Sequence, residues 1–206
     1  LLNEGFVEMT KNWICNVKPM KGVLDKTLFV ATDIAAYDEL KTFDRSLNVV
    51  LHKYTADKVL TFGQIGYYNF MLFRTGLILN LLEKGFNLWL TESDATWIRD
   101  PTKMVTSSPG DIVAMSDRAI GSLAIQGGFI LLRPTAATKN IWTKLLQMHT
   151  ASMEAHIGGD SHKDIKNDGN EQQMLGKLIR HEPIKLSWLS QSNFLSGLWY
   201  SNQNMR

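Results

Sequence analysis

The sequence predicts an α/β fold with a mixed, mainly parallel β-sheet flanked by helices. Short apolar runs with the length of buried strands alternate along the chain with longer segments of helical periodicity. This alternation places helices on the faces of a sheet. The chain has 206 residues, of which 44% are hydrophobic and 20% charged. We therefore expect residues 1–206 to form one globular domain with a substantial core.

The expected elements follow from periodicity and from residues that begin or end helices. Phe6, Met9 and Trp13 mark the apolar side of the first helix, Gly85 ends the longest helix, and Thr135 is an N-cap. Helices are expected over residues 4–15, 35–42, 66–84, 135–153 and 170–180, strands over 27–33, 47–51, 87–90, 111–117, 128–133 and 185–189, and a loop over 158–169.

Composition and charge exclude several classes of protein. The net charge is only +2 and no Lys/Arg run occurs, so nucleic acid is not expected as a partner. The most apolar segment, residues 67–82, contains Asn69, Arg74 and Asn80, which indicates a core helix rather than a membrane span. One cysteine, Cys15, cannot form an internal disulfide, which mildly favours a reducing compartment, although a lumenal domain can also lack disulfides.

Two carboxylates at the end of a predicted strand form the first candidate site. Glu92 and Asp94 directly follow the apolar strand over residues 87–90. One interpretation is a solvated strand end with a helix cap. The other is a divalent metal site, because Mg²⁺ and Mn²⁺ prefer hard oxygen ligands and are often bound by one or two carboxylates plus substrate phosphates. Trp89 and Trp97 bracket the pair and suggest an apolar setting, in which unpaired carboxylates are costly.

A glycine pair forms the second candidate site. Gln126, Gly127 and Gly128 precede a predicted strand. The two glycines can form a bend entering the sheet. Alternatively, they allow the backbone to approach a ligand closely, with the Gln126 amide offering donors and acceptors to sugar hydroxyls.

Polar residues at the start of the last predicted helix are the third candidate. Asp168 and Glu171 have the spacing of a capping box, which explains them structurally. The functional interpretation places one polar side chain, Glu171 or Gln172, beneath a bound sugar. Arg74 also needs an anionic partner within its apolar helix. That partner is either an internal carboxylate, such as a strand-end acid, or the phosphate or sugar of a ligand.

Other catalytic motifs are not present in the sequence. The histidines lack metal-ligand spacing, so surface or core positions are expected for them. There is no Gly-x-Ser-x-Gly, Walker loop or Cys-x-x-Cys motif, and no Gly-x-Gly-x-x-Gly follows a strand, so a dinucleotide-binding domain is poorly supported.

In combination, the motifs resemble the nucleotide-diphospho-sugar transferase domain of glycosyltransferase family 77, over about residues 25–200. The segments that carry the resemblance are Arg74-Thr-Gly-Leu-Ile-Leu-Asn-Leu-Leu-Glu-Lys-Gly85, Leu-Thr-Glu92-Ser-Asp94-Ala-Thr-Trp97-Ile-Arg-Asp-Pro101, Asp111-Ile-Val-Ala-Met-Ser-Asp117, Gly127-Gly-Phe-Ile-Leu-Leu-Arg-Pro-Thr135 and Asn170-Glu-Gln172. The resemblance implies a GT-A (Rossmann-like) fold, a divalent metal (usually Mn²⁺, or Mg²⁺), a UDP-sugar donor and transfer with retention to a glycan or glycoprotein.

The resemblance also assigns roles to residues. It implies that Asp94 binds the metal and that Glu92 touches the metal or the ribose. Arg74 and the turn Gln126, Gly127 and Gly128 would contact the donor sugar. Glu171 and Gln172 stand where an acid–Gln pair lies under the sugar, and Asp117 would face the acceptor.

The chain departs from the family pattern at several positions. Glu92 and Gln126 are each one methylene longer than the usual Asp and Asn, and the usual third metal ligand, a histidine, would lie beyond Arg206. The usual first strand would lie before Leu1, so we expect a domain truncated at both ends. A non-catalytic module that binds a sugar nucleotide or glycan is the alternative function. A nucleotidyltransferase would need a basic glycine-rich loop, which is not seen.

The resemblance implies a location in the Golgi or the secretory-pathway lumen, while the residues themselves leave a cytoplasmic location open. The chain does not begin with Met. Any signal or membrane attachment is therefore expected in a stem or anchor outside these residues.

Overall fold

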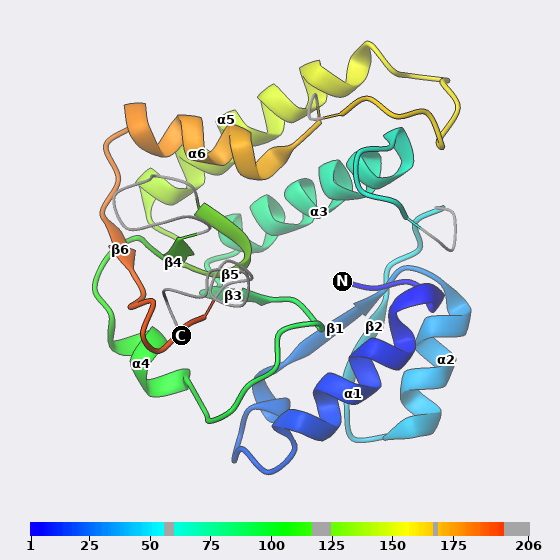
Figure 1. Cartoon of the computed structure of the whole chain (residues 1–206), viewed down its shortest axis with the longest axis vertical. Coiled ribbons are helices and arrows are strands. Elements are labelled where there is room, and N and C mark those ends of the chain that lie inside the picture. Colours follow the sequence, from blue (N-terminus) through cyan, green and yellow to red (C-terminus); the bar gives the residue numbers. More distant parts are fainter. Residues whose placement is uncertain (56–59, 117–124, 167–168, 196–206) are drawn as a thin grey trace, which may run out of the picture. The chain divides into compact units, whose positions relative to one another are not determined.

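The computed structural model describes residues 1–55, 60–116, 125–166 and 169–195 (Figure 1). The chain divides into two compact units. Unit 1 comprises Leu1–Thr61 and Glu92–Lys103, and unit 2 comprises Phe62–Thr91 and Met104–Arg206. The expectation of a single domain over residues 1–206 stays a prediction.

Unit 1 is built on two parallel strands and two helices. Strands β1 (Leu28–Ala31) and β2 (Asn48–Leu51) pair in parallel, with Leu28 opposite Asn48. Helix α2 (Ile34–Phe43) connects them, which is the usual way to join neighbouring parallel strands. The side chain of Asp33 accepts a hydrogen bond from the Ala36 amide and caps α2.

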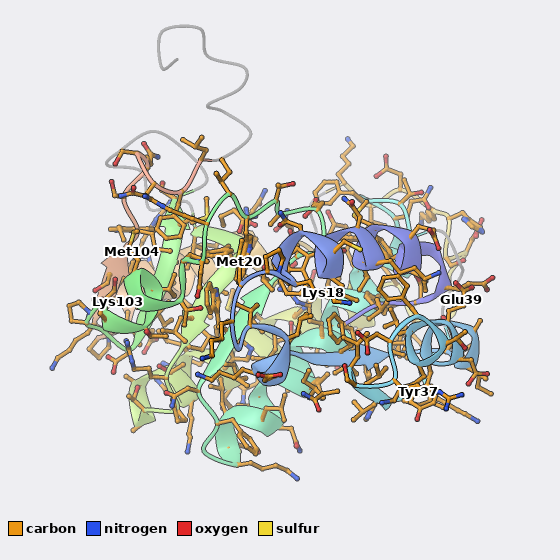
Figure 2. The ribbon with its side chains drawn as sticks, turned by 90° about the horizontal axis from the view of Figure 1, so that it is seen from below. Lys18, Met20, Tyr37, Glu39, Lys103 and Met104 are labelled. Atoms are coloured by element: carbon orange, nitrogen blue, oxygen red, sulfur yellow. The ribbon has the colours of Figure 1, made fainter. Side chains whose placement is uncertain are left out.

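Helix α1 (Val7–Val17) follows a short 3₁₀ turn, Glu4–Phe6, and buries one stripe of its surface. The buried positions are Val7, Thr10, Trp13, Ile14 and Val17, which recur at helical spacing. Met9 lies off this stripe and is 43% exposed, so its predicted place on the apolar side is wrong. At the surface, Lys11 Nζ lies 3.0 Å from a carboxylate oxygen of Glu39 on α2. Glu39 is labelled in Figure 2.

Unit 2 contains a four-stranded sheet in the order β3-β5-β4-β6. These strands are β3 (Leu88–Thr91), β4 (Ile112–Ser116), β5 (Ile125–Leu132) and β6 (Leu186–Trp188). The sheet is mixed, as predicted, and helices flank it. It is less parallel than expected, because β5 pairs antiparallel with both β3 and β4 and only β4 with β6 is parallel.

Three helices lie together along this sheet in Figure 1: α3 (Ile65–Glu83), α5 (Ala136–Glu154) and α6 (Glu171–His181). They share one apolar core with the strands. Its buried members come from all three helices and from β4 and β5: Ile78, Leu79, Leu82, Ile112, Ala114, Ile125, Ile130, Leu132, Ile141, Trp142, Leu145, Met174, Leu175 and Ile179. Burial of this apolar surface is the main stabilising contribution within unit 2.

The helix ends show how the sequence sets these elements. Gly85 follows α3 with φ of +88°, a left-handed conformation that favours glycine, as its predicted role requires. Thr135 caps α5 by accepting a hydrogen bond from the Thr138 amide at 3.2 Å, which confirms it as the N-cap. Asn170 caps α6 and accepts from the Gln173 amide at 3.1 Å. Glu171 is the first residue of the helix, and Asp168, the other member of the predicted capping box, lies outside the described residues.

A short helix, α4 (Thr102–Ser107), was not expected from the sequence. The Asp100 carboxylate accepts a hydrogen bond from the Thr102 amide at 2.8 Å and so begins it. At its end, the Arg133 guanidinium donates to the carbonyl oxygens of Thr106 and Ser108. Among the residues that the structure describes, no helix is both long and apolar enough to span a bilayer.

Candidate functional site

Arg74 stands at the centre of the candidate site in unit 2. It projects from the middle of α3, and its guanidinium lies 3.3 Å from a carboxylate oxygen of Glu171, the first residue of α6. The two side chains are only 15% and 16% exposed. The partner of Arg74 is therefore an internal carboxylate, but it belongs to α6 and not to the strand-end acids that the sequence suggested. The ion pair joins two helices that are far apart in the sequence.

The same guanidinium also fixes a main-chain position in β5. Its second nitrogen donates to the Gly127 carbonyl oxygen at 2.9 Å, and the Gly127 amide donates to Gln172 Oε1 at 2.9 Å. The Gly127 residue is thus held through both its carbonyl and its amide. A side chain there would not fit easily, because a Cβ would lie 3.3 Å from Gln172 Oε1.

The glycines of this motif lie inside a strand and not before it. Gln126, Gly127 and Gly128 are the second to fourth residues of β5, where the pairing with β4 shifts register between Ala114 and Ser116. The strand was expected to begin at Gly128, so the prediction that Gln126 and Gly127 precede it is wrong. Because a register shift exposes main-chain groups that a regular ladder would use, it is a suitable place for ligand contact.

One polar atom of the motif Gln126, Gly127 and Gly128 has no hydrogen-bond partner among the described residues. The side-chain carbonyl oxygen of Gln126 is buried and accepts no hydrogen bond from them. A buried acceptor without a partner is costly unless water or a ligand supplies a donor. The same cluster borders a small cavity, which is lined by Arg74, Thr75, Ile78, Leu90, Gly127, Ile130, Trp142, Leu145, Glu171, Gln172 and Leu175.

The predicted metal residues belong to unit 1. Glu92 and Asp94 follow β3 in a turn, in which the Ala95 amide donates to the Glu92 carbonyl oxygen at 3.2 Å. Both residues are exposed, so the predicted apolar setting is wrong and the cost of burying them does not arise. In the described ranges, no three His, Cys, Asp or Glu side chains gather as a metal site. The two carboxylates are hard oxygen donors and fit a divalent cation that takes its other ligands from a diphosphate.

The segment that carries these carboxylates is anchored to α1 by Asn16, which sequence reasoning missed. The Asn16 amide donates to the Trp97 carbonyl oxygen at 3.0 Å, and its oxygen accepts from the Trp97 amide at 2.8 Å. The Trp97 ring is buried against Trp13, with ring centroids 5.5 Å apart. The only available signal was a polar residue next to the buried stripe of α1.

The remaining prediction for the site concerns Asp117. It lies outside the described residues, so its assignment to the acceptor side stays a prediction.

A histidine near Arg74 has a structural role. His149 on α5 is fully buried, and its Nδ1 lies 3.5 Å from Thr75 Oγ1 on α3. Burial lowers the pKa of His149 to about 4, and the backbone of Gly169 opposes this shift. The imidazole is therefore neutral at physiological pH, in agreement with the core position that the sequence allowed.

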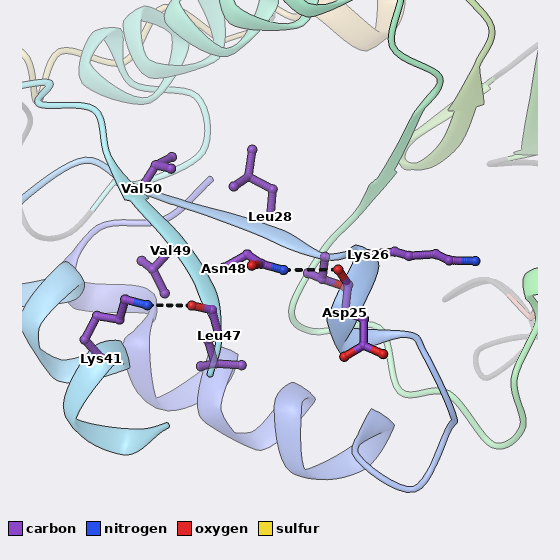
Figure 3. Close-up of a pocket in the computed structure, with 9 residues that line it drawn as sticks. Asp25, Lys26, Leu28, Lys41, Leu47, Asn48, Val49 and Val50 are labelled. Carbon is purple, nitrogen blue, oxygen red and sulfur yellow. Dashed lines mark hydrogen bonds between the residues drawn. The ribbon is translucent and has the colours of Figure 1, made fainter. Parts of the chain in front are cut away.

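Unit 1 contains a shallow open hollow at the start of β1 and β2 (Figure 3), but its polar groups serve the fold. Lys41 Nζ donates to the Leu47 carbonyl oxygen at 2.7 Å, and the Asn48 amide donates to the Asp25 carbonyl oxygen at 3.1 Å. Figure 3 shows the Lys26 side chain extending away from these contacts. Because the polar groups of Lys41 and Asn48 are engaged within the fold, the cluster around Arg74 is the better candidate site.

Comparison with solved structures supports the fold. The chain is similar to the glycosyltransferase GlyE of Streptococcus pneumoniae TIGR4, with a TM-score of 0.56 and 14% identity. The alignment covers 92% of this chain and 44% of that chain. At this identity the likeness shows the fold alone, an α/β arrangement in which helices flank the sheets.

Sequence comparison gives the family. Residues 22–206 match the family model described as nucleotide-diphospho-sugar transferase, a range that includes parts of both units. This chain belongs to that family, as the motifs predicted, and it carries a glycosyltransferase domain of the nucleotide-sugar type.

Curated relatives come from Arabidopsis thaliana. One, named UDP-D-xylose:L-fucose alpha-1,3-D-xylosyltransferase, is 26% identical over 96% of this chain and 56% of its own length. Another, named an uncharacterised protein, is 30% identical over 63% of this chain and 40% of its own length. The chain thus spans about half the length of the curated relatives it matches.

Proposed function

We propose that this domain transfers a sugar from a UDP-sugar to a hydroxyl of a glycan or glycoprotein, in a metal-dependent reaction that retains the anomeric configuration. The observation that supports the proposal best is the convergence of Arg74, Gly127, Glu171 and Gln172 in unit 2. These residues come from three separate segments, and each was assigned to the donor sugar from the sequence. Membership of the nucleotide-diphospho-sugar transferase family makes a nucleotide sugar the expected ligand.

In this proposal the cluster holds the donor sugar. The buried Gln126 oxygen would accept from a sugar hydroxyl, and Gly127 would let the sugar approach the main chain. Gln172 and Arg74 hold Gly127 in place through its amide and carbonyl. Because Arg74 balances the charge of Glu171, this carboxylate serves to bind and orient rather than to attack the sugar.

Glu92 and Asp94 would hold a divalent cation, Mn²⁺ or Mg²⁺. When bound, this ion would neutralise charge on the departing diphosphate. The exposed positions of both carboxylates leave them accessible to an ion and to the phosphates of a donor.

The reaction that fits these residues is attack from the front face. The acceptor hydroxyl approaches the anomeric carbon on the side from which the diphosphate leaves. The bond from that carbon to the phosphate oxygen breaks as the bond to the acceptor oxygen forms. The proton of the acceptor hydroxyl passes to the leaving phosphate oxygen, and the sugar carries oxocarbenium character in between.

The donor that should be tested first is UDP-xylose, because a relative that covers most of this chain carries that donor in its name. A location in the Golgi or secretory lumen is part of the proposal. Selectivity among donors depends on a few contacts worth about 1–3 kcal/mol each, so a panel of UDP-sugars is needed.

The test measures UDP release from that panel with Mn²⁺ and with EDTA, for the wild type, Asp94→Asn and Asp100→Asn. Asp100 is an exposed acid of the same segment that begins α4, and its asparagine variant keeps the capping oxygen. We expect metal-dependent release that Asp94→Asn abolishes and Asp100→Asn retains. Full activity of Asp94→Asn would contradict the metal assignment. UDP binding by calorimetry without release from any donor would instead support a binding module.

A further inference from the structure

We propose that Gly169 is a positioning residue for the donor site. It allows the main chain at position 169 to lie directly against α3 and α5, and thereby fixes where Glu171 and Gln172 stand. This inference rests on the proposed function for its effect on donor binding. Its structural part can be tested without any donor.

The first observation is the absence of space for a side chain at Gly169. A Cβ built there would lie 2.5 Å from Tyr68 Cγ and 2.8 Å from Met153 Sδ. Tyr68 on α3 is fully buried and Met153 on α5 is 3% exposed, so neither can move freely. The Cγ atom is the root of the tyrosine ring and not the end of a flexible chain. Any side chain at position 169 must therefore push the main chain away from both helices.

The second observation is independent of the first. The segment 161–166, which precedes Gly169, is hydrogen-bonded to the start of α3. The amides of Ile65 and Gly66 donate to the carbonyl oxygens of Lys163 and Ser161 at 3.0 and 2.8 Å. These amides belong to the first turn of α3 and have no partner within the helix.

Two further contacts fix the same segment. The Ile165 amide donates to the Gly63 carbonyl oxygen at 2.9 Å, and the Tyr68 hydroxyl donates to the Lys166 carbonyl oxygen. The Ile165 side chain is buried with Ile65, Tyr68 and Met153 in a small apolar cluster of its own. Tyr68 thus holds the segment through its hydroxyl and contacts Gly169 through its ring.

The position of Gly169 in the chain gives these contacts a consequence for the site. The next residue, Asn170, caps α6, and Glu171 and Gln172 then contact Arg74 and Gly127. Because only Asn170 lies between Gly169 and Glu171, a shift of Gly169 also moves the side chains of Glu171 and Gln172. Displacements of about 1 Å near a site can cost on the order of a hundredfold in rate.

The structural test compares amide hydrogen exchange in Gly169→Ala with a matched variant, Gly76→Ala. Gly76 also lies in unit 2, but a Cβ there meets its nearest neighbour, Leu146, at an ordinary 3.9 Å. We expect faster exchange of the Gln173 and Met174 amides, which bond to Asn170, in Gly169→Ala only. Protection that is unchanged, or lost equally throughout unit 2, would overturn the inference.

The functional test measures calorimetric affinities for UDP and for the UDP-sugar that the wild type accepts. Glu171 and Gln172 are assigned to the sugar, so Gly169→Ala should weaken UDP-sugar binding about tenfold or more while UDP binding stays unchanged. Gly76→Ala should change neither. Equal losses for both ligands would indicate general damage and overturn the inference. A wild type that binds no UDP-sugar would refute the proposed function, and the exchange experiment would still decide the positioning role.

A second variant covers the case in which Gly169→Ala does not fold. Tyr68→Phe removes only the hydroxyl that bonds to Lys166 and adds no bulk. We expect faster amide exchange at Ile65 and Gly66 and, as a consequence, faster amide exchange at Gln173 and Met174 as well. Faster exchange at the start of α3 with no change at Gln173 would show that the two regions are not coupled, which would overturn the inference.

Discussion

At the residue scale, Arg74 makes two kinds of contact that a single substitution can separate. Its charge pairs with Glu171, whereas the forked shape of the guanidinium also reaches the Gly127 carbonyl oxygen. Lysine would keep the charge but is a point donor without the planar fork. The ion pair and the main-chain contact therefore depend on different properties of the same side chain.

We predict that Arg74→Lys retains the fold but lowers kcat/KM for the UDP-sugar about tenfold, because Gly127 loses one of the two bonds that hold it. Steady-state kinetics with thermal unfolding would measure both effects. Arg180→Lys, at an exposed position of α6, is the matched control and should leave both unchanged. If Arg74→Lys kept the wild-type kcat/KM, the planar fork of the Arg74 guanidinium would not be needed for activity.

The sequence drew attention to Arg74 and Gly127 because an arginine in an apolar helix and a glycine pair beside a strand are unusual locally, and the structure brings both together with Glu171 and Gln172. The sequence did not identify their partners. The Arg74–Glu171 pair connects α3 to α6, and no local pattern reports which buried cation meets which carboxylate. It also placed Glu92 and Asp94 in an apolar setting, because neighbouring tryptophans in the sequence do not fix the direction of a turn.

At the element scale, the segment Glu92–Lys103 depends on α1 for its position. Asn16 bonds to both the amide and the carbonyl of Trp97, as a neighbouring strand would. These two hydrogen bonds take the place of backbone pairing in a segment that has little regular secondary structure. A segment held by two bonds and one buried ring can keep its carboxylates in a defined place while leaving them exposed.

We predict that Asn16→Ala lowers the free energy of unfolding of unit 1 by about 1–3 kcal/mol, because two partly buried main-chain groups of Trp97 lose their partner. It should also weaken Mn²⁺ binding. Chemical denaturation and metal titration would measure these effects. Asn12→Ala, on the exposed side of the same helix, is the control and should alter neither. Equal stabilities for the two variants would contradict the anchoring role.

Elements with strong local signals were predicted well, and those that depend on distant partners were not. The long helix ending before Gly85 and the helix capped by Thr135 have clear boundaries in the sequence. Helix α4 was missed because it is short and is held by Arg133, which comes later in the chain. The start of β5 was placed too late, because two glycines resemble a turn although tertiary pairing extends the strand through them.

At the scale of the whole molecule, the pattern predicted the α/β class but overestimated the parallel content. Alternation of helix and strand along the chain does not record strand direction. The antiparallel position of β5 between β3 and β4 is set by how the chain returns to the sheet. The roles given to the acids, to Asp117 and to the metal remain predictions for experiment.

Stability at low pH is expected to depend on His149. The folded form takes up a proton only near pH 4, whereas an exposed histidine has a pKa of 6.5. Between these values the unfolded chain binds more protons than the folded chain, so stability is present above about pH 6.5 and is lost as the pH falls toward 4. The loss is on the order of 3 kcal/mol.

We predict that His149→Gln flattens this part of the stability profile, whatever its effect at neutral pH. Urea denaturation at a series of pH values would measure the slope. His181→Gln, at an exposed end of α6, should keep the wild-type slope. An unchanged slope in His149→Gln would assign the acid sensitivity to other groups.

The parallel pairing of β4 with β6 has a consequence for synthesis. Residues Ile112 to Ala114 of β4 pair with Leu186 to Trp188, which come much later in the chain. A nascent polypeptide that has not yet reached Leu186 therefore carries β4 with one open, apolar edge. Such edges template association with other chains. This enzyme domain should accordingly be most prone to aggregation while it is still attached to the ribosome, and slow translation or chaperones acting before β6 emerges should determine its yield.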